Sequence, residues 1–182
     1  MKHIVMLSLM LMLGACGSGD QQSASSSDES PADAGQSLVQ DDTSEPNVVR
    51  VAVGSADHTT LVAALKAAGY VDELTNAGPF TVFAPTNSAF DKLPAGTVEN
   101  LLKPENRDQL RNILEYHVYV GMLQENFVRD GMVLNQVNLS NATLHKQGSE
   151  VRINDAKVLG VVKASNGMVY VIDQVLLPPD KK

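Results

Sequence analysis

Cysteine and tryptophan are almost absent from this 182-residue sequence, which has one cysteine, Cys16, and no tryptophan. A single cysteine excludes an intrachain disulfide, so packing and hydrogen bonds alone must hold the fold. Four phenylalanines and four tyrosines are too few to favour a large aromatic ligand pocket, although aliphatic residues could line one. The apolar run at Ile4–Leu13 is shorter than the roughly 20 residues that a membrane-spanning helix needs.

Sequence motifs of common catalytic and nucleotide-binding sites are missing as well. We find no G-x-S-x-G, no H-E-x-x-H, no P-loop and no G-x-G-x-x-G. No cysteine follows Cys16, which excludes thiolate catalysis and zinc–thiolate sites from the rest of the chain. His58 and His145 lie far apart and lack the spacing of metal ligands. We therefore predict no enzymatic activity, no metal site and no cofactor.

The sequence does contain the pattern of an export signal at its start. Residues 1–15 place Lys2 and His3 before an apolar run, as a secretory signal peptide does. The run ends in Leu13-Gly14-Ala15-Cys16, which resembles the bacterial lipobox. That resemblance implies that Cys16 receives lipid and becomes the new N-terminus. A free thiol or an intermolecular disulfide is the alternative for a lone exported cysteine.

If Cys16 is lipidated, its acyl chains would bind a membrane, which is the first expected partner. The expected location is then the bacterial cell envelope. Two or more acyl chains anchor a protein stably where a single chain does not. The next residue is Gly17 and not aspartate, which favours the outer membrane if the source has two membranes.

Residues 16–46 join the predicted anchor to the rest of the chain. Residues 17–46 have seven acidic residues, no lysine or arginine, and only Leu38 and Val39 as sizeable apolar side chains. This composition cannot bury enough surface to offset the entropy of ordering, so we expect a disordered, plain tether and not a recognition segment. The remaining domain is nearly neutral and has no basic stripe, so nucleic acid is not an expected partner.

Residues 47–179 carry the periodic patterns of one folded domain, and the helical patterns come first. Asp57–Ala68 has apolar side chains at i, i+3, i+4 and i+7, which predicts an amphipathic helix that Gly69 is placed to end. Further helical segments are predicted at Tyr70–Ala77, after Thr86 as an N-cap, at Val98–Leu102, and after Pro104, where Leu110, Ile113, Leu114 and His117 share one stripe.

Strand patterns dominate the later part of the domain. Ser165-Asn166-Gly167 supplies the residues that a tight hairpin needs, because Asn and Gly tolerate a positive φ. Helices followed by strands predict an α+β fold in a single copy, with a short tail at residues 180–182, and we expect a monomer. The predicted strands are Phe80–Ala84, Met132–Val137, Thr143–His145, Glu150–Ile153, Lys157–Val162, Met168–Ile172 and Val175–Leu177.

Two segments of the domain carry a family resemblance. Gly78–Leu93 reads GPFTVFAPTNSAFDKL, and Asn166–Pro178 reads NGMVYVIDQVLLP. In this order and at this separation they resemble the two signature segments of the fasciclin (FAS1) domain, over about Asn47 to Pro179. The resemblance implies a wedge-like β-sandwich of about seven strands flanked by helices. It also implies a binding and adhesion module and not an enzyme.

Tyr116 and His117 are the candidate binding residues. They match a Tyr-His pair that recurs between the two signature segments of fasciclin domains, and in animal members segments around this pair are implicated in integrin binding. The alternative, which we favour, is that His117 ends an apolar stripe and is buried with its hydrogen bonds satisfied. Burial would keep the imidazole neutral and lower its pKa.

Three functions follow from these observations. The first is adhesion or matrix and envelope interaction by a membrane-anchored module, with an unknown protein or glycan as partner. The second is binding of a small apolar ligand, since some fasciclin proteins bind ligands such as carotenoids. The third is an envelope hydrolase, which the missing motifs disfavour. A polar face would favour the first, an apolar groove the second, and a cluster of His, carboxylate and Ser the third.

Overall fold

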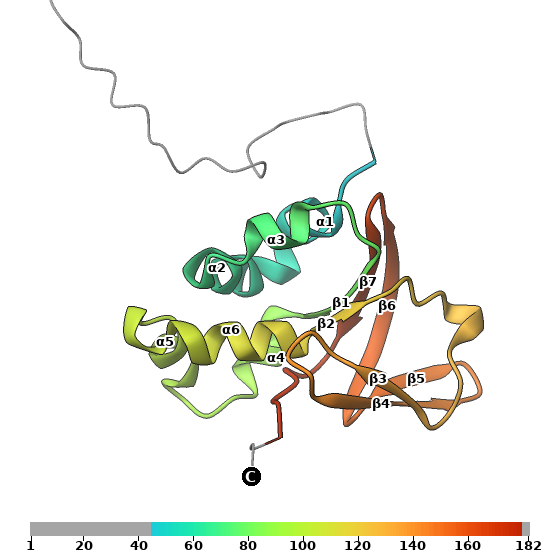
Figure 1. Ribbon diagram of the computed structural model, residues 1–182. Coiled ribbons are helices and arrows are strands. Elements are labelled where there is room, and N and C mark those ends of the chain that lie inside the picture. The colour runs from blue at the N-terminus through green and yellow to red at the C-terminus, as the bar shows by residue number, and fades with distance from the viewer. Residues whose placement is uncertain (1–44, 180–182) are drawn as a thin grey trace, which may run out of the picture. The chain divides into compact units, whose positions relative to one another are not determined.

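The computed structural model describes residues 45–179 of the chain (Figure 1). The predicted signal peptide, Cys16, most of the tether and the tail at residues 180–182 lie outside the described residues. Helices occupy most of the first half and strands most of the second, with one strand among the early helices. The α+β prediction is confirmed.

The helices are short, and the two longest pack against each other. The described residues form α1 (Val48–Val53), η2 (Ala56–His58), α2 (Thr59–Ala68), α3 (Val71–Thr75), α4 (Asn87–Asp91), α5 (Thr97–Leu101), η3 (Pro104–Asn106), α6 (Arg107–Tyr116) and η4 (Glu125–Phe127), where η denotes a 3₁₀ turn. The apolar stripe of α2 is buried as predicted, and Gly69 ends the helix at φ 65°. Helix α1 was not predicted from the sequence.

The N-terminus of α2 is capped by a side chain from another helix. His58 occupies the N-cap position but gives α2 no side-chain hydrogen bond. Asn87, at the start of α4, accepts hydrogen bonds from the Thr60 N–H (3.0 Å) and the Thr59 hydroxyl (3.2 Å). Its amide also donates to the Ala56 carbonyl at 2.9 Å. Asn87 therefore joins α4 to the start of α2. Its amide N–H group makes the bond to Ala56, and an aspartate at this position would lack that donor.

The seven strands form a sheet in the order β2-β1-β7-β6-β5-β4-β3. The first and last strands of this order approach each other, since Val137, just after β3, donates its N–H to the Val118 carbonyl of β2 at 2.9 Å. The sheet is therefore nearly closed. Its strands are β1 (Phe80–Pro85), β2 (Val118–Val120), β3 (Met132–Asn135), β4 (Asn141–Gln147), β5 (Glu150–Ile153), β6 (Ala156–Ala164) and β7 (Gly167–Ile172).

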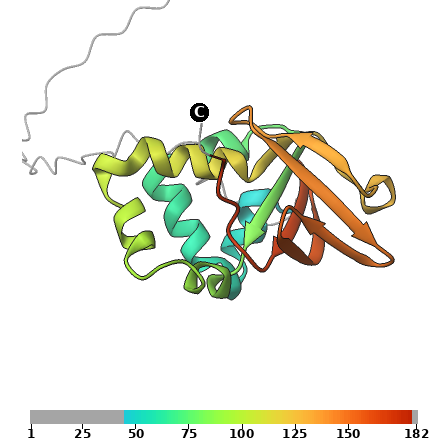
Figure 2. The ribbon, with the colours of Figure 1, turned by 90° about the horizontal axis from the view of Figure 1, so that it is seen from below.

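Two hydrophobic cores lie on opposite faces of β1 and β7. Figure 2 shows the helical layer on one side of β1 and most of the strands on the other. Val82 and Val169, which are partners in the parallel β1–β7 ladder, belong to the core under the helices. The next pair, Phe83 and Tyr170, belongs to the core shared with β3, β4 and β5. Strand β6 pairs with both β7 and β5 and joins the two halves of the sheet. The prediction of a seven-strand sandwich flanked by helices is confirmed.

The hairpin at Ser165-Asn166 is present, but the predicted reason for it is wrong. Neither Asn166 nor Gly167 has a positive φ. Gly167 is required because a Cβ atom there would lie 1.9 Å from the carbonyl oxygen of Phe80. The Asn166 side chain accepts a hydrogen bond from the Val48 N–H and donates to the carbonyls of Leu74 and Asn76, each at 2.9 Å. This turn therefore connects α1, α3 and β1.

Other local predictions also need correction. Val175–Leu177 is not a strand, because its Leu176 N–H is bound by a histidine side chain and not by a neighbouring strand. Strand β2 was missed because it has only three residues, too few for a periodic pattern. Thr86 holds the N-cap position of α4, but its hydroxyl bonds to the Ser88 hydroxyl (2.9 Å) instead of a backbone N–H.

We expect Asn166→Ala to lower the free energy of unfolding by about 2–3 kcal/mol. The change removes three hydrogen bonds, and each typical bond contributes a net of about 1 kcal/mol. Urea denaturation at neutral pH measures the change. Asn126→Ala is a matched control, because Asn126 is exposed in η4 and its loss should change stability little. Equal stability of both variants would contradict the role assigned to Asn166.

Candidate functional site

Tyr116 lies at the end of α6 and is almost fully buried. Its hydroxyl donates to the Asn141 carbonyl at 2.9 Å and accepts from the Asn154 amide at 3.0 Å. Asn154 lies in the β5–β6 turn and also accepts a hydrogen bond from the Thr143 N–H. Tyr116 thus ties the end of α6 to strand β4 and to the β5–β6 turn.

His117 follows α6 directly and is also buried, with 3% of its surface exposed. Its Nε2 lies 3.0 Å from the Leu176 backbone nitrogen, which can only donate, so Nε2 accepts and carries no proton. Its Nδ1 lies 2.7 Å from the Ile113 carbonyl and is therefore the protonated nitrogen of the neutral ring. Burial lowers the pKa of His117 to about 4.

This geometry confirms the expected burial of His117. The imidazole holds the segment after β7 against α6, and the neighbouring Leu176 side chain packs in the core of the strands. Tyr116 and His117 are brought together, but each points into the interior and presents almost no surface to a partner. Their role in binding stays a prediction.

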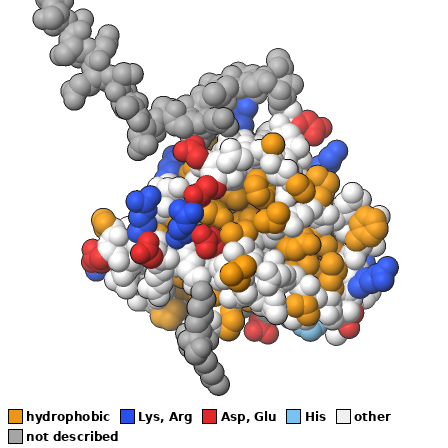
Figure 3. Space-filling view, viewed as in Figure 1, with side chains coloured by type: hydrophobic (Ala, Val, Ile, Leu, Met, Phe, Trp, Pro, Cys, Tyr) orange, Lys and Arg blue, Asp and Glu red, His pale blue; other side chains and the backbone are white. Residues whose placement is uncertain are grey.

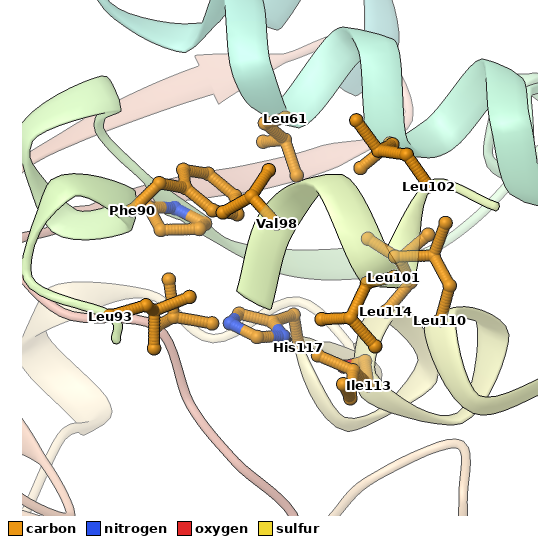
Figure 4. Close-up of a pocket in the computed structure, with 13 residues that line it drawn as sticks. Leu61, Phe90, Leu93, Val98, Leu101, Leu102, Leu110, Ile113, Leu114 and His117 are labelled. Atoms are coloured by element: carbon orange, nitrogen blue, oxygen red, sulfur yellow. Dashed lines mark hydrogen bonds between the residues drawn. The ribbon is translucent and has the colours of Figure 1, made fainter. Parts of the chain in front are cut away.

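An apolar cleft adjoins His117, between α2, α5 and α6 (Figure 4). Leu61, Val98 and Leu114 are among the side chains that point into it. The cleft has a volume of about 20 Å³. Since a single water molecule needs about 10–15 Å³ by this measure, the cleft has room for about one water and not for a pigment.

Ser55 and His58 also come together, at 2.9 Å between the Ser55 hydroxyl oxygen and His58 Nδ1. The buried Nε2 of His58 has no hydrogen-bond partner, so no carboxylate orients this ring as in a hydrolytic triad. Burial lowers the pKa of His58. His145 is exposed on β4, and residues 45–179 contain no group of three potential metal ligands from His, Cys, Asp and Glu.

A polar groove lies on the outward face of β4 and β5. It has a volume of about 290 Å³ and is lined by His145, Gln147, Glu150, Arg152, Asn154 and Asp155. His145 and Arg152 are direct neighbours across the two strands. Glu150 accepts from Arg152 Nε at 2.7 Å and from Lys157 Nζ at 3.0 Å. The groove thus offers hydrogen-bond donors and acceptors and charges of both signs.

Hydrogen bonds within the polar groove fix some of its side chains. The hydrogen bonds from Arg152 and then Lys157 lower the pKa of Glu150, which keeps its carboxylate ionised. The Arg152 side chain is half exposed, so part of it is accessible to a ligand. His145 Nδ1 lies 3.6 Å from Asp130.

The sequence analysis did not identify the polar groove. A signal for it exists, because His145 and Gln147 alternate with buried or half-buried residues, and Glu150, Arg152 and Asn154 follow the same period of two. That alternation marks the solvent face of a strand pair. Only the hairpin register places His145 opposite Arg152, however, and period alone does not give the register.

Comparisons with known proteins agree with the architecture. A family model described as the fasciclin domain matches residues 56–178. The chain belongs to the fasciclin family. Its two signature segments, around β1 and β7, are the two strands that separate the hydrophobic cores. Among the described residues of this fasciclin domain, no helix is both long enough and apolar enough to cross a bilayer.

Three curated relatives illustrate how widely the domain is shared. Protein sll1483 of Synechocystis is 51% identical over 133 residues, which cover 72% of this chain and 73% of the relative. Immunogenic protein MPB70 of Mycobacterium bovis is 39% identical over 152 residues, covering 80% and 75%. Cell surface glycolipoprotein MPB83 of Mycobacterium bovis is 43% identical over 112 residues, covering 60% of this chain and 48% of that protein.

The burial of His117 leads to a testable prediction about how the stability of the fold depends on pH. Its pKa of about 4 in the folded chain lies below the ordinary value of 6.5, so the neutral ring stabilises the fold fully above pH 6.5. This contribution is lost as the pH falls from 6.5 to about 4, and a shift of this size corresponds to about 3 kcal/mol. Urea denaturation across this pH range measures the loss.

The variant His117→Asn should be less stable at pH 7 by about 2 kcal/mol, because it leaves a buried hydrogen-bonding group unsatisfied. Its stability should also depend less on pH between 6.5 and 4, so that the difference from the parent chain shrinks on acidification. His145→Asn is the control, because His145 is exposed and its replacement should leave the pH dependence intact. An unchanged melting temperature for His117→Asn would refute the structural role.

Proposed function

We propose that this fasciclin domain is a membrane-anchored binding module of the bacterial cell envelope. Its function would be adhesion or interaction with extracellular matrix or envelope components. The observation that carries the proposal is the polar groove on β4 and β5, where Glu150 holds Arg152 and Lys157 in place and His145 lies beside them. We infer that the domain acts by binding and not by catalysis.

The chemistry of the groove indicates the kind of partner. Amide, imidazole, guanidinium and carboxylate groups line it together, so it can donate and accept hydrogen bonds at several points. Polyhydroxylated glycans and polar protein surfaces offer the matching groups. A fixed guanidinium group costs little further ordering when it binds, which favours Arg152 as the central contact.

A small apolar ligand receives less support from the His117 cleft. The cleft holds about 20 Å³, whereas pockets for small molecules usually have volumes of about 300–1,000 Å³. Hydrolysis is supported less still, because both nitrogens of His117 are occupied and His58 lacks an orienting carboxylate. These observations favour the binding of a macromolecule.

The proposed location rests on Cys16 and on a relative. The lipobox-like sequence before Cys16 would supply a lipid anchor, and residues 17–46 would give the domain its reach from the membrane. MPB83 bears the name of a cell surface glycolipoprotein, and it shares the domain with this chain. We extend that location to this protein as part of the proposal, with the outer membrane as the site in a bacterium with two membranes.

The polar groove can be tested with a double variant, His145→Ala with Arg152→Ala. Removing the central contacts should weaken retention of the chain on envelope polysaccharide or matrix material by tenfold or more, which corresponds to at least about 1.4 kcal/mol. Sedimentation with increasing amounts of the material gives the affinity. Lys66→Ala with Lys103→Ala removes two exposed cations elsewhere and should leave binding unchanged. Equal loss in both variants would contradict the site.

The anchor can be tested separately with Cys16→Ser. Without a thiol to acylate, the chain should move from the membrane fraction to the soluble fraction, because no described helix can span the bilayer. Fractionation followed by immunodetection measures the distribution. A chain that stays in the membrane fraction would show that something other than Cys16 holds it there. Ser18→Ala is the matched control and should stay membrane-bound.

A further inference from the structure

A second groove lies where the described part of the chain begins. It has a volume of about 490 Å³ and is lined by Asn47, Thr75, Ala77, Gly78, Pro79, Met122, Ser165 and Asn166. We call it the N-terminal groove. Met122 on its wall is 42% exposed, and nearby Val120, which pairs with Phe80 next to Pro79, is 62% exposed. Figure 3 shows apolar side chains gathered on this face over β1 and β2.

Several large apolar side chains are exposed among the described residues, and Met122 is one of them that lines a groove. Val120 is the last residue of the short strand β2, and Met122 lies two residues beyond it. Between them, the Gly121 N–H donates to the Pro79 carbonyl at 3.0 Å and holds this segment beside Pro79. Contiguous exposed apolar surface on a soluble domain commonly marks a contact site.

The chain reaches this groove at a fixed point. Ser165, on the groove wall, donates its N–H to the Pro46 carbonyl at 3.0 Å. Asn47 also lines the groove and caps α1 by accepting from the Arg50 N–H at 2.8 Å. The residues that precede Pro46 therefore start at the edge of the N-terminal groove, whatever path they then take.

Leu38 and Val39 are the only sizeable apolar side chains between Gly17 and Pro46. They precede Pro46 by seven and eight residues, a length that can span up to about 25 Å and has an average end-to-end distance of about 15 Å. A short connection of this kind gives a tethered group an effective concentration in the millimolar range near its point of attachment.

We propose that Leu38 and Val39 dock in the N-terminal groove against Pro79 and Met122. The other residues of the segment are polar, acidic or small, so this pair is its largest apolar group. The docked segment covers exposed apolar surface in the free protein and shortens the reach of the tether by the residues that it engages. The proposal is independent of the polar groove.

Solvent accessibility of the Met122 methyl group tests the proposal in the full mature chain carrying Cys16→Ser, which removes lipidation. Methionine methyl groups are labelled with ¹³C, the Met122 signal is assigned with Met122→Leu, and a soluble paramagnetic reagent reports exposure. The Met122 signal should be protected in this chain and should lose its protection in Leu38→Asn with Val39→Asn. Other methionine signals serve as internal references.

Ala32→Asn with Ala34→Asn is the matched control, since it places the same side chains elsewhere in the tether and should keep Met122 protected. Equal exposure of Met122 in the parent chain and in the Leu38/Val39 variant would overturn the proposal. Protection that disappears when the parent chain is diluted would also overturn it, because a second copy would then cover the groove. Leu38 and Val39 lie outside the described fold, so an unchanged melting temperature verifies that the variant domain is intact.

Discussion

The parallel pairing of β1 with β7 is the constraint on which the rest of the structure depends. It joins six consecutive residues of each strand, from Phe80–Gly167 to Pro85–Ile172. The two strands are buried on both faces, so they divide the domain into a helical layer and a layer of strands. The close approach of Gly167 to Phe80 starts this ladder, and β2 and β6 extend the sheet from it on either side.

Polar side chains then connect the layers that this pairing separates. His117 accepts the Leu176 N–H and binds the Ile113 carbonyl, Asn166 joins its turn to α1 and α3, and Asn87 caps α2. Each of them supplies hydrogen bonds to backbone groups of other segments, and leaving such groups unpaired is costly where they are buried, as at His117. Asn166 directly precedes β7, and His117 binds Leu176 after β7. The C-terminal signature segment is therefore joined to other parts of the fold at both of its ends.

The features that the chain shares with its family are therefore mainly core residues. The residues that bind a partner have to be sought on the surface. The signature strands supply core residues, and the Tyr-His pair that resembles a recognition element in animal relatives is directed inward in this chain. Two other surfaces have the exposure that binding needs. One is polar and lies on β4 and β5, and the other is apolar and lies where the N-terminal segment meets the domain. Their opposite chemistry suits two different kinds of contact.

Sequence alone determined most of the helices and strands, because the period of apolar residues is a local property, and the two signature segments indicated the family by resemblance. The sequence predicted the apolar stripe of α2, the strand at Phe80 and the signature segment around Asn166. It also predicted the burial of His117. Strand β2, with its three residues, and the irregular segment at Val175 have no periodic pattern of apolar residues. Their structure could therefore not be predicted from such a pattern.

Only the tertiary structure decided which polar side chains hold distant segments and which line a groove. His117 meets a backbone group 59 residues away, and Asn166 meets one 118 residues away. The hairpin register places His145 opposite Arg152, and the hydrogen bond from the Ser165 N–H to the Pro46 carbonyl places the start of the described chain beside the hairpin before β7. Such pairings depend on where the folded chain brings its segments together, and a local pattern of residues contains no information about a partner that is distant in sequence.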